Sequence, residues 1–218
     1  MIPLRSSERT FSPAVMTLTL IIANFLVFFY EIALPPWQLD RFIMHYGIVP
    51  DQLHYSQLLT SMFIHGGWLH IIGNMWFLWI FGRSIEDLLG HVRYIIFYLV
   101  CGIAAALMQV LIDPYSRIPT VGASGAIAGV MGAYLVKFPR ARIVTLVPIF
   151  FFITTFDLPA AFLLIYWFAI QFFSGVGSVG STQASSSNIA FFAHIGGFIC
   201  GMVLILLMPS ERRYRAWY

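Results

Sequence analysis

Residues Val121 to Ala133 read VGASGAIAGVMGA, an apolar run that carries a single hydroxyl. Gly125, Gly129 and Ala133 recur in it at four-residue spacing, a pattern that lets two helix backbones approach closely in a membrane. A serine in such a run, here Ser124, is more often a hydrogen-bonding packing residue than a nucleophile. The role of Ser124 therefore has to be inferred from residues elsewhere in the chain.

The composition is that of an integral membrane protein. Of the 218 residues 60% are hydrophobic and only 10% are charged, with a mean hydropathy of +0.84, whereas about a quarter of the residues in a soluble domain are charged. The net charge of +3 gives no reason to expect nucleic acid as a partner. Cys101 and Cys200 lie inside apolar runs, which favours packing roles over a disulfide or a thiolate metal site.

Six apolar segments predict an all-α, six-helix membrane bundle that forms one domain over residues 1–218. Each segment approaches the ~20 residues needed to cross the hydrocarbon core, although the fourth and fifth are somewhat short. The first runs on too long for a cleaved signal peptide, so we expect it to remain in the mature protein. The segments are residues 13–32, 58–81, 94–112, 124–138, 158–173 and 189–208.

The basic residues orient this bundle. If the N-terminus is cytoplasmic, the outer side holds only Arg41 and Arg117 of the 12 Lys and Arg residues. Basic residues gather on the cytoplasmic side of membrane proteins, so we expect both termini there. The inner side then collects Arg5, Arg9, Arg83, Arg93, Lys137, Arg140, Arg142, Arg212, Arg213 and Arg215.

Three connections have distinctive patterns. Residues 33–57 carry apolar side chains at mostly three- and four-residue spacing, which predicts a short amphipathic piece in the membrane interface. Residues 174–188 are rich in serine and glycine, which predicts a flexible loop on the outer face just before the sixth helix. Residues 143–156 contain Pro148 and are too interrupted for a span, so we expect an interfacial connection at the inner side.

A few polar side chains lie inside the apolar segments, where their burial costs a few kcal/mol and makes each a functional candidate. At 1.5 Å per residue, Ser124 and His194 both lie ~22 Å above the inner boundary, with His70 at ~20 Å and Asn74 at ~14 Å. These four side chains are therefore expected to share one recessed site that opens outward. The full set is His65, His70, Asn74, Gln109, Ser124, Gln171 and His194.

The spacing of the histidines argues against a metal site. His65 and His70 are five residues apart and separated by two glycines, whereas HxxxH would place two imidazoles on one helix face. His65 therefore belongs to the start of the helix, and no metal or other cofactor is expected. Ser124 and His194 can approach because Gly197 and Gly201 on the sixth segment form a second small-residue ladder opposite the first.

These residues permit nucleophilic catalysis. A serine hydroxyl needs an adjacent base, and a neutral imidazole is the usual one, so Ser124 and His194 are predicted to form a dyad. None of the nine acids lies within a segment at the level of His194, so packing or water must orient its ring. The predicted oxyanion donors are the backbone N–H groups of Ala123 and Ser124 at a helix start and the side chains of His70 and Asn74.

Three motifs in this order resemble the rhomboid family of intramembrane serine proteases. They are HGGWLHIIGN at His65 to Asn74, GASG at Gly122 to Gly125 and AHIGGFICG at Ala193 to Gly201. The resemblance covers the chain from the first helix to the last and implies cleavage of single-pass membrane proteins in or near their transmembrane segments. It places the nucleophile at Ser124, the base at His194 and the oxyanion side chains at His70 and Asn74. It also implies an interfacial element within residues 33–57 and a flexible cap over the site at residues 174–188. The resemblance is to the prokaryotic six-helix form, which implies a location in the inner cell membrane.

The chain departs from well-studied rhomboids at two points. Ala128 stands where a tyrosine one turn after the nucleophile packs on the catalytic imidazole, and the first outer loop lacks a Trp–Arg pair. Two other functions stay open: a catalytically silent rhomboid-like binder of membrane helices, and a small transporter with a polar midplane site. The oligomeric state is unknown. Candidates to replace the missing tyrosine are Tyr98, Tyr134, Tyr166 and Trp167.

Overall fold

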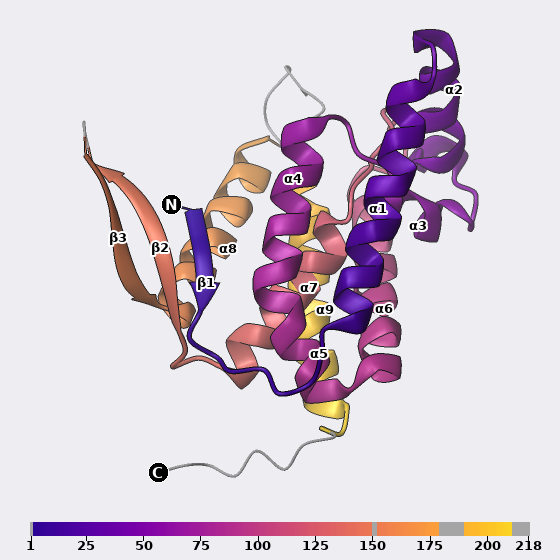
Figure 1. Ribbon diagram of the computed structural model, residues 1–218. Helices are drawn as coiled ribbons and strands as arrows, with labels where there is room; N and C mark the ends of the chain where they lie inside the picture. Colours follow the sequence, from indigo (N-terminus) through magenta and orange to yellow (C-terminus); the bar gives the residue numbers. More distant parts are fainter. Residues whose placement is uncertain (1, 150–151, 179–189, 211–218) are drawn as a thin grey trace.

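The computed structural model describes residues 2–149, 152–178 and 190–210, which are mostly helical (Figure 1). The chain begins with a strand, and a hairpin separates the helices of its two halves. The elements are β1 (Ile2–Ser6), α1 (Val15–Ala33), α2 (Pro36–Tyr46), the 3₁₀ turn η1 (Pro50–Gln52), α3 (Gln57–Thr60), the 3₁₀ turn η2 (Ser61–Phe63), α4 (Trp68–Phe77), the π-helical turn η3 (Leu78–Gly82), α5 (Arg83–Leu89), α6 (His91–Ile112), α7 (Ser124–Lys137), β2 (Arg142–Ile149), β3 (Phe152–Pro159), α8 (Ala160–Ser178) and α9 (Ala190–Leu207).

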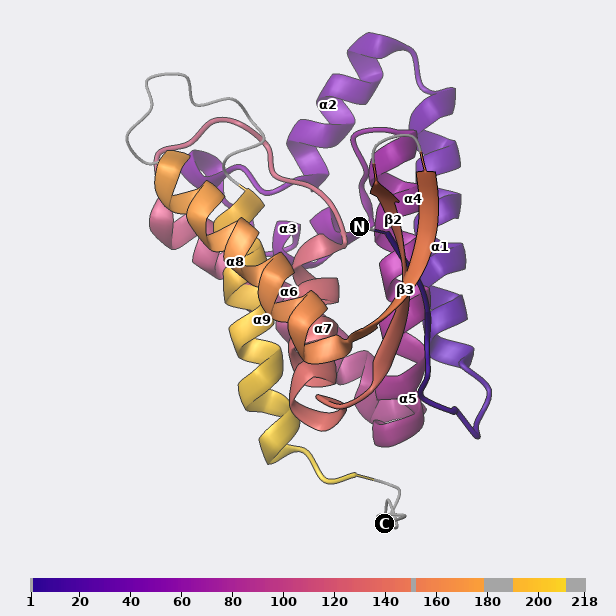
Figure 2. The ribbon, with the colours of Figure 1, turned by 90° about the vertical axis from the view of Figure 1, so that its left-hand side faces the viewer.

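Helix α7 is the central element. Every residue from Gly125 to Tyr134 is buried, as expected for a helix that is apolar on all sides. Figures 1 and 2 show it enclosed by α4, α6, α8 and α9. Most of the apolar run Val121 to Ala133 therefore lies in the core of the molecule.

Glycines set the distance between α7 and its neighbours. A methyl group at Gly197 or Gly201 of α9 would overlap the carbonyl oxygen of Gly125 or Gly129 of α7. The same two α7 glycines turn their own open faces mainly toward Ala105 and its neighbours on α6. The glycines of α7 thus allow two helices to pack closely: α6 against their α-carbons and α9 against their carbonyl oxygens.

The second predicted span is not one helix from 58 to 81. It starts with the short turns α3 and η2, breaks at Gly66 and Gly67, and becomes continuous only from Trp68 through α4, η3 and α5 to Leu89. Gly67 has φ +149°, a backbone conformation that other residues rarely adopt. The break therefore places His65 before the helix and His70 in its first turn.

Two acidic side chains near the end of this continuous helix accept hydrogen bonds from the backbone at and just before the start of α1. The Glu86 carboxylate accepts hydrogen bonds from the Met16 and Thr17 backbone N–H groups at 2.7 and 2.8 Å. Asp87 accepts one from Ser12 N–H at 2.8 Å. Carboxylates are favourable at helix N-termini, where backbone donors lack intrahelical partners. Both acids, which lie between the second and third predicted segments, are therefore hydrogen-bonded to the backbone that leads into α1.

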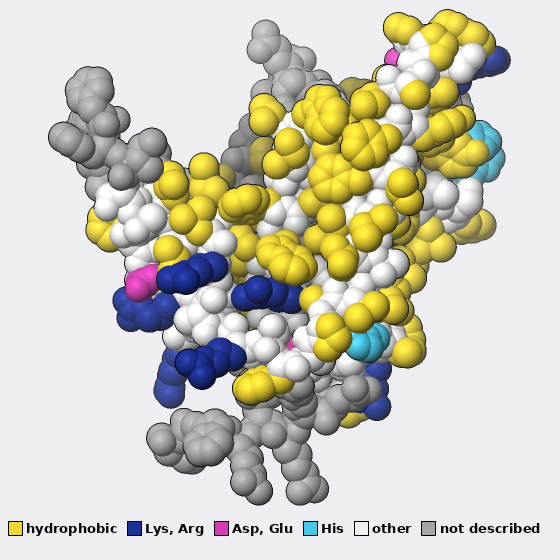
Figure 3. Space-filling model, viewed as in Figure 1, with side chains coloured by type: hydrophobic (Ala, Val, Ile, Leu, Met, Phe, Trp, Pro, Cys, Tyr) yellow, Lys and Arg dark blue, Asp and Glu magenta, His cyan; other side chains and the backbone are white. Residues whose placement is uncertain are grey.

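Among the residues that the structure describes, only α1 and α6 are both long and apolar enough to cross a membrane by themselves. Three shorter apolar stretches lie at Ser124–Lys137, Ala160–Phe173 and Phe191–Leu207. Large apolar side chains cover the outside of the bundle, including Leu26, Leu69 and Leu111. Figure 3 shows this apolar surface over α1 and α4, with Lys and Arg gathered toward the opposite, lower part of the view. This distribution is that of a helix bundle with one basic end.

The prediction of an all-α chain needs correction, because three strands form an antiparallel sheet in the order β1-β2-β3. Strands β2 and β3 pair in unbroken register from Arg142 opposite Pro159 to Ile149 opposite Phe152. Strand β2 is rich in valine and isoleucine, and β3 is rich in threonine and phenylalanine. These residues favour extended structure. The segment predicted as an interfacial connection is therefore a hairpin, and α8 begins after it at Ala160.

The first strand ties this sheet to the helices. β1 is antiparallel to β2, and its Pro3 carbonyl accepts a hydrogen bond of 2.6 Å from Trp76 Nε1 of α4. Ser6 Oγ hydrogen-bonds Tyr134 Oη of α7. Figures 1 and 2 show the sheet standing alongside α4 and α8. The beginning of the chain thus lies against the same helices that surround the predicted site.

The two predicted outer loops fare differently. Helix α2 lies within residues 33–57, and none of its residues is buried. In the predicted cap at 174–188, residues 174–178 form the end of α8. Residues 179–189 lie outside the described part of the chain. Its flexibility and its role as a cap therefore stay predictions.

Candidate active site

The loop that leads into α7 is held in an unusual backbone conformation. Gly122 has φ +122°, and its N–H donates to the Ser61 carbonyl at 2.9 Å. A methyl group at Gly122 would lie 2.8 Å from the Nε2 atom of His70, closer than real side chains approach. Only glycine fits here, because both the positive φ and the imidazole exclude a β-carbon.

Ser124 is the first residue of α7, and its hydroxyl meets the side chain of His194 on α9. Ser124 Oγ lies 2.7 Å from His194 Nε2, a normal hydrogen-bond length between a hydroxyl and an imidazole. The glycine contacts between α7 and α9 bring the two backbones close enough for this bond. The two residues that were placed at the same depth from sequence are therefore also direct neighbours.

Helix α8 supplies two further contacts to the imidazole. Gln171 Oε1 lies 2.7 Å from His194 Nδ1, and the Trp167 ring packs on the imidazole with centroids 5.7 Å apart at 43°. Trp167 is one of the four aromatic residues proposed to compensate for Ala128, which is itself buried. The contact with Gln171 was not predicted, although its polarity within an apolar segment had marked it as a candidate.

His70 and Asn74 face the same cavity as the Ser124–His194 pair. This cavity has a volume of about 310 Å³, and its walls include Trp167 and Gln171. The amide nitrogen of Asn74 is buried without a hydrogen-bond partner. An unpaired buried donor is costly. We therefore expect the Asn74 amide to find an acceptor when a substrate occupies the cavity.

His65 and Glu31 lie behind His70. The two imidazoles pack edge to face with centroids 5.1 Å apart, and both His65 ring nitrogens are buried without partners. The His65 backbone N–H donates to the Glu31 carboxylate at 3.3 Å. Sequence reasoning missed this role of Glu31, the acidic residue of α1, whose hydrogen bond joins the C-terminal end of α1 to the segment that precedes α4.

A second, apolar cavity of about 200 Å³ adjoins the first. The two share Phe77, Met131 and Trp167, and the second is bounded by Pro3 of β1 and by Leu163 of α8. It therefore extends the polar site sideways, between α4 and α8, toward the sheet.

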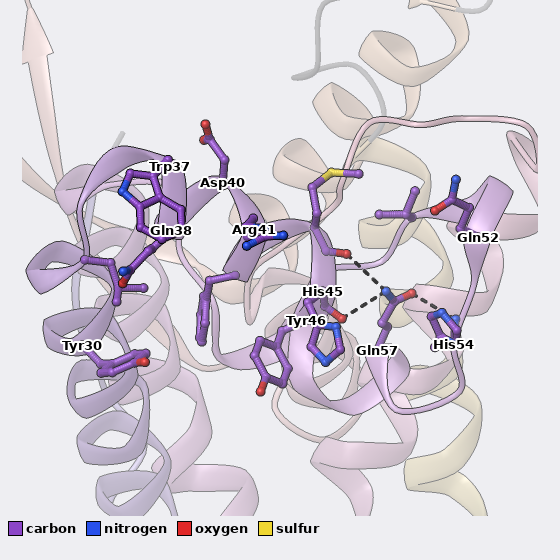
Figure 4. Close-up of a pocket in the computed structure, with 14 residues that line it drawn as sticks. Tyr30, Trp37, Gln38, Asp40, Arg41, His45, Tyr46, Gln52, His54 and Gln57 are labelled. Atoms are coloured by element: carbon purple, nitrogen blue, oxygen red, sulfur yellow. Dashed lines mark hydrogen bonds between the residues drawn. The ribbon is translucent and has the colours of Figure 1, made fainter.

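A hollow larger than either of these two cavities lies elsewhere in the molecule. It has a volume of about 770 Å³, lies between the end of α1, α2 and α3, and includes Trp37, Arg41 and His45 (Figure 4). Gln57 donates from its amide to the Met44 and His45 carbonyls across it, at 3.4 and 3.2 Å. Neither Ser124 nor His194 lines this hollow, so size alone does not locate the chemistry.

No group of three or more His, Cys, Asp or Glu side chains suited to a metal ion occurs in the part of the chain that the structure describes. Cys101 and Cys200 are free thiols. The prediction that the site works without a metal or cofactor stays a prediction.

The fold and the site together define a helical membrane protein with a serine–histidine pair in a recessed cavity. The family profile described as Rhomboid domain matches residues 52–211. The chain therefore belongs to the rhomboid family, as its three motifs indicated.

Several characterised relatives carry the same family name. RHOMBOID-like protein 6, mitochondrial, of Arabidopsis thaliana is 31% identical over 157 residues, which cover 71% of this chain and 45% of that protein. Rhomboid protein 1, mitochondrial, of Saccharomyces cerevisiae is 28% identical over 177 residues, or 77% and 47%. Rhomboid protease GluP of Bacillus subtilis is 37% identical over 84 residues, or 38% and 16%. The chain thus spans about half the length of the first two relatives and less of the third.

Proposed function

We propose that this rhomboid is an intramembrane serine endopeptidase that cleaves single-pass membrane proteins in or near their transmembrane segments. The observation that carries the proposal is the 2.7 Å contact between Ser124 Oγ and His194 Nε2 in a cavity that also holds His70 and Asn74. A nucleophile, its base and side-chain donors for an oxyanion are the parts that acyl transfer requires.

In the proposed reaction Ser124 Oγ attacks the scissile carbonyl carbon and its proton passes to His194 Nε2. The tetrahedral oxyanion is stabilised by the Ser124 backbone N–H, which has no intrahelical partner, with help from Ala123, His70 and Asn74. His194 then protonates the departing amine, which leaves an acyl ester on Ser124. Water, activated by the same imidazole, hydrolyses this ester and restores the hydroxyl.

The hydrogen bonding of His70 suits an oxyanion donor. Gly66 N–H donates to His70 Nδ1 at 3.4 Å, so Nδ1 accepts and the ring proton is on Nε2. This Nε2 is the atom that lies against Gly122, two residues before the nucleophile. The packing of His65 on the same ring holds the donor in place.

The second, apolar cavity supports the proposal that the substrate lies in the membrane. Its lining is apolar, and it reaches from the catalytic cavity outward between α4 and α8. We infer that a transmembrane segment approaches from this side, with water reaching the site from the outer end of the bundle. In this proposal the protein crosses the inner cell membrane six times, both termini are cytoplasmic, and the site opens on the opposite side.

The test is proteolysis in proteoliposomes that contain the purified protein and candidate single-pass membrane proteins, with mass spectrometry of the fragments. We expect cuts in or beside the transmembrane segments by the parent and none by Ser124→Ala. Fragments produced equally by Ser124→Ala would contradict the proposal. Stable complexes with intact substrates, and no cleavage by the parent, would identify a silent helix-binding protein instead.

A further inference from the structure

The polar surroundings of His194 include an uncharged partner on the side away from Ser124. Gln171 Oε1 lies 2.7 Å from Nδ1, while Ser124 Oγ lies 2.7 Å from Nε2. A carbonyl oxygen can only accept a hydrogen bond, so this contact requires the ring proton to be on Nδ1. Nε2 then presents its lone pair to the serine hydroxyl, which is the tautomer that a general base needs.

Helix α8 fixes the imidazole by two contacts from one face. Trp167 and Gln171 are four residues apart and therefore project to the same side of α8. The indole packs on the imidazole ring, and the amide fixes the rotation of that ring about its attachment to the chain. No carboxylate among residues 2–149, 152–178 and 190–210 forms a hydrogen bond with His194, so Gln171 occupies the place that an aspartate has in serine–histidine–aspartate triads.

We propose that Gln171 is a positioning residue of the site: its side-chain carbonyl selects the Nδ1-protonated tautomer of His194. This role rests on the proposed function only for its effect on catalysis, since the tautomer exists whether or not substrate is cleaved. An amide is neutral, so it orients the ring without a buried charge, which would be costly at this depth in a membrane. Ser124, His194 and Gln171 are thus arranged as in a catalytic triad, but Gln171, unlike an aspartate, is not ionisable.

The direct test is nitrogen NMR of the protein with ¹⁵N-labelled histidine rings in detergent micelles, with the His194 signals assigned by their loss in His194→Ala. In the parent we expect the neutral ring of His194 to carry its proton on Nδ1. In Gln171→Leu we expect a mixture of tautomers or the Nε2-protonated form. A parent ring protonated on Nε2, or an unchanged tautomer in Gln171→Leu, would overturn the proposal.

Catalysis provides the second readout. Gln171→Leu should lower kcat by about 10- to 100-fold with little change in KM, a smaller loss than the ~10²- to 10⁴-fold contribution of a general base, because a fraction of the rings keeps the productive tautomer. Gln171→Glu should restore most of this loss, because a carboxylate also accepts from Nδ1. Phe172→Leu, at the exposed neighbouring residue of α8, serves as the control and should match the parent.

The two proposals fail in different ways. If the parent shows the Nδ1-protonated ring but cleaves nothing, the tautomer assignment stands and the proposed protease function fails. If the parent cleaves substrate while Gln171→Leu retains kcat within about threefold, Gln171 is structural only and the positioning role fails. Should Gln171→Leu not fold, the parent spectrum and Gln171→Glu decide, since an Nε2-protonated parent ring alone contradicts the role.

Discussion

At the scale of single residues, the site depends on where donors and acceptors point. Sequence reasoning selected Ser124, His194, His70 and Asn74 because polar groups are costly in a membrane, and the structure places all four around one cavity. It could not pair Gln171 with His194, because spacing along α8 does not show which neighbouring helix that face of α8 meets. The partner of a side chain on another helix is a property of packing.

Asn74 gives the sharpest test of the oxyanion proposal. Its amide nitrogen is buried without a partner beside the cavity. If this nitrogen donates to the oxyanion, Asn74→Leu should reduce kcat by about 10²- to 10³-fold with a small effect on KM. Steady-state cleavage of a transmembrane substrate measures both constants.

The matched control is Asn24→Ala in α1, which also removes a buried amide, one that donates to the Leu20 carbonyl at 2.7 Å. That variant should retain kcat if it folds. Equal losses in the two variants would mean that Asn74 contributes to folding only.

Among the elements, the close packing of α7 and α9 brings Ser124 and His194 together. The small-residue ladders were recognisable in the sequence, but their division of labour was not, because it depends on which face of α7 meets α6. The hairpin was missed because Pro148 and the apolar run around it were interpreted as an interrupted connection rather than as strands. Pairing with β1 links residues more than a hundred positions apart, and local patterns carry no information on such distant partners.

A single methyl group tests this alignment. In Gly197→Ala the new carbon would overlap the Gly125 carbonyl oxygen, so the helices must separate and the 2.7 Å contact of the dyad must lengthen. We expect a loss of about 1–3 kcal/mol of stability, as in other overpacked cores, and a loss of activity greater than this destabilisation explains.

Val203→Ile adds one carbon to the exposed face of the same helix and should leave both stability and turnover unchanged. Thermal unfolding in detergent and substrate cleavage measure the two effects. Parental turnover in Gly197→Ala would show that close backbone approach is not required for the dyad.

At the scale of the whole molecule, the distribution of charge orients the bundle. The loop before α7 lies at the same end as Ser124, whereas Arg140 follows the other end of α7, where basic residues gather. In the proposed topology the first end faces outward and the second faces the cytoplasm.

Tyr115 and Arg140, both exposed, report on these two ends. In intact cells a membrane-impermeant maleimide should label Tyr115→Cys and leave Arg140→Cys unmodified, and permeabilisation should expose both. Labelling of Arg140→Cys from outside, with Tyr115→Cys protected, would reverse the topology and place the site on the cytoplasmic side.

In the proposed mechanism His194 activates Ser124 as a nucleophile. The most direct measurement is covalent labelling of the detergent-solubilised protein by a fluorophosphonate, with the modified residue located by peptide mass spectrometry. We predict one adduct, on Ser124, that disappears in Ser124→Ala and falls to background in His194→Ala. An adduct on another residue, or labelling of Ser124 at the parental rate in His194→Ala, would contradict the proposed dyad.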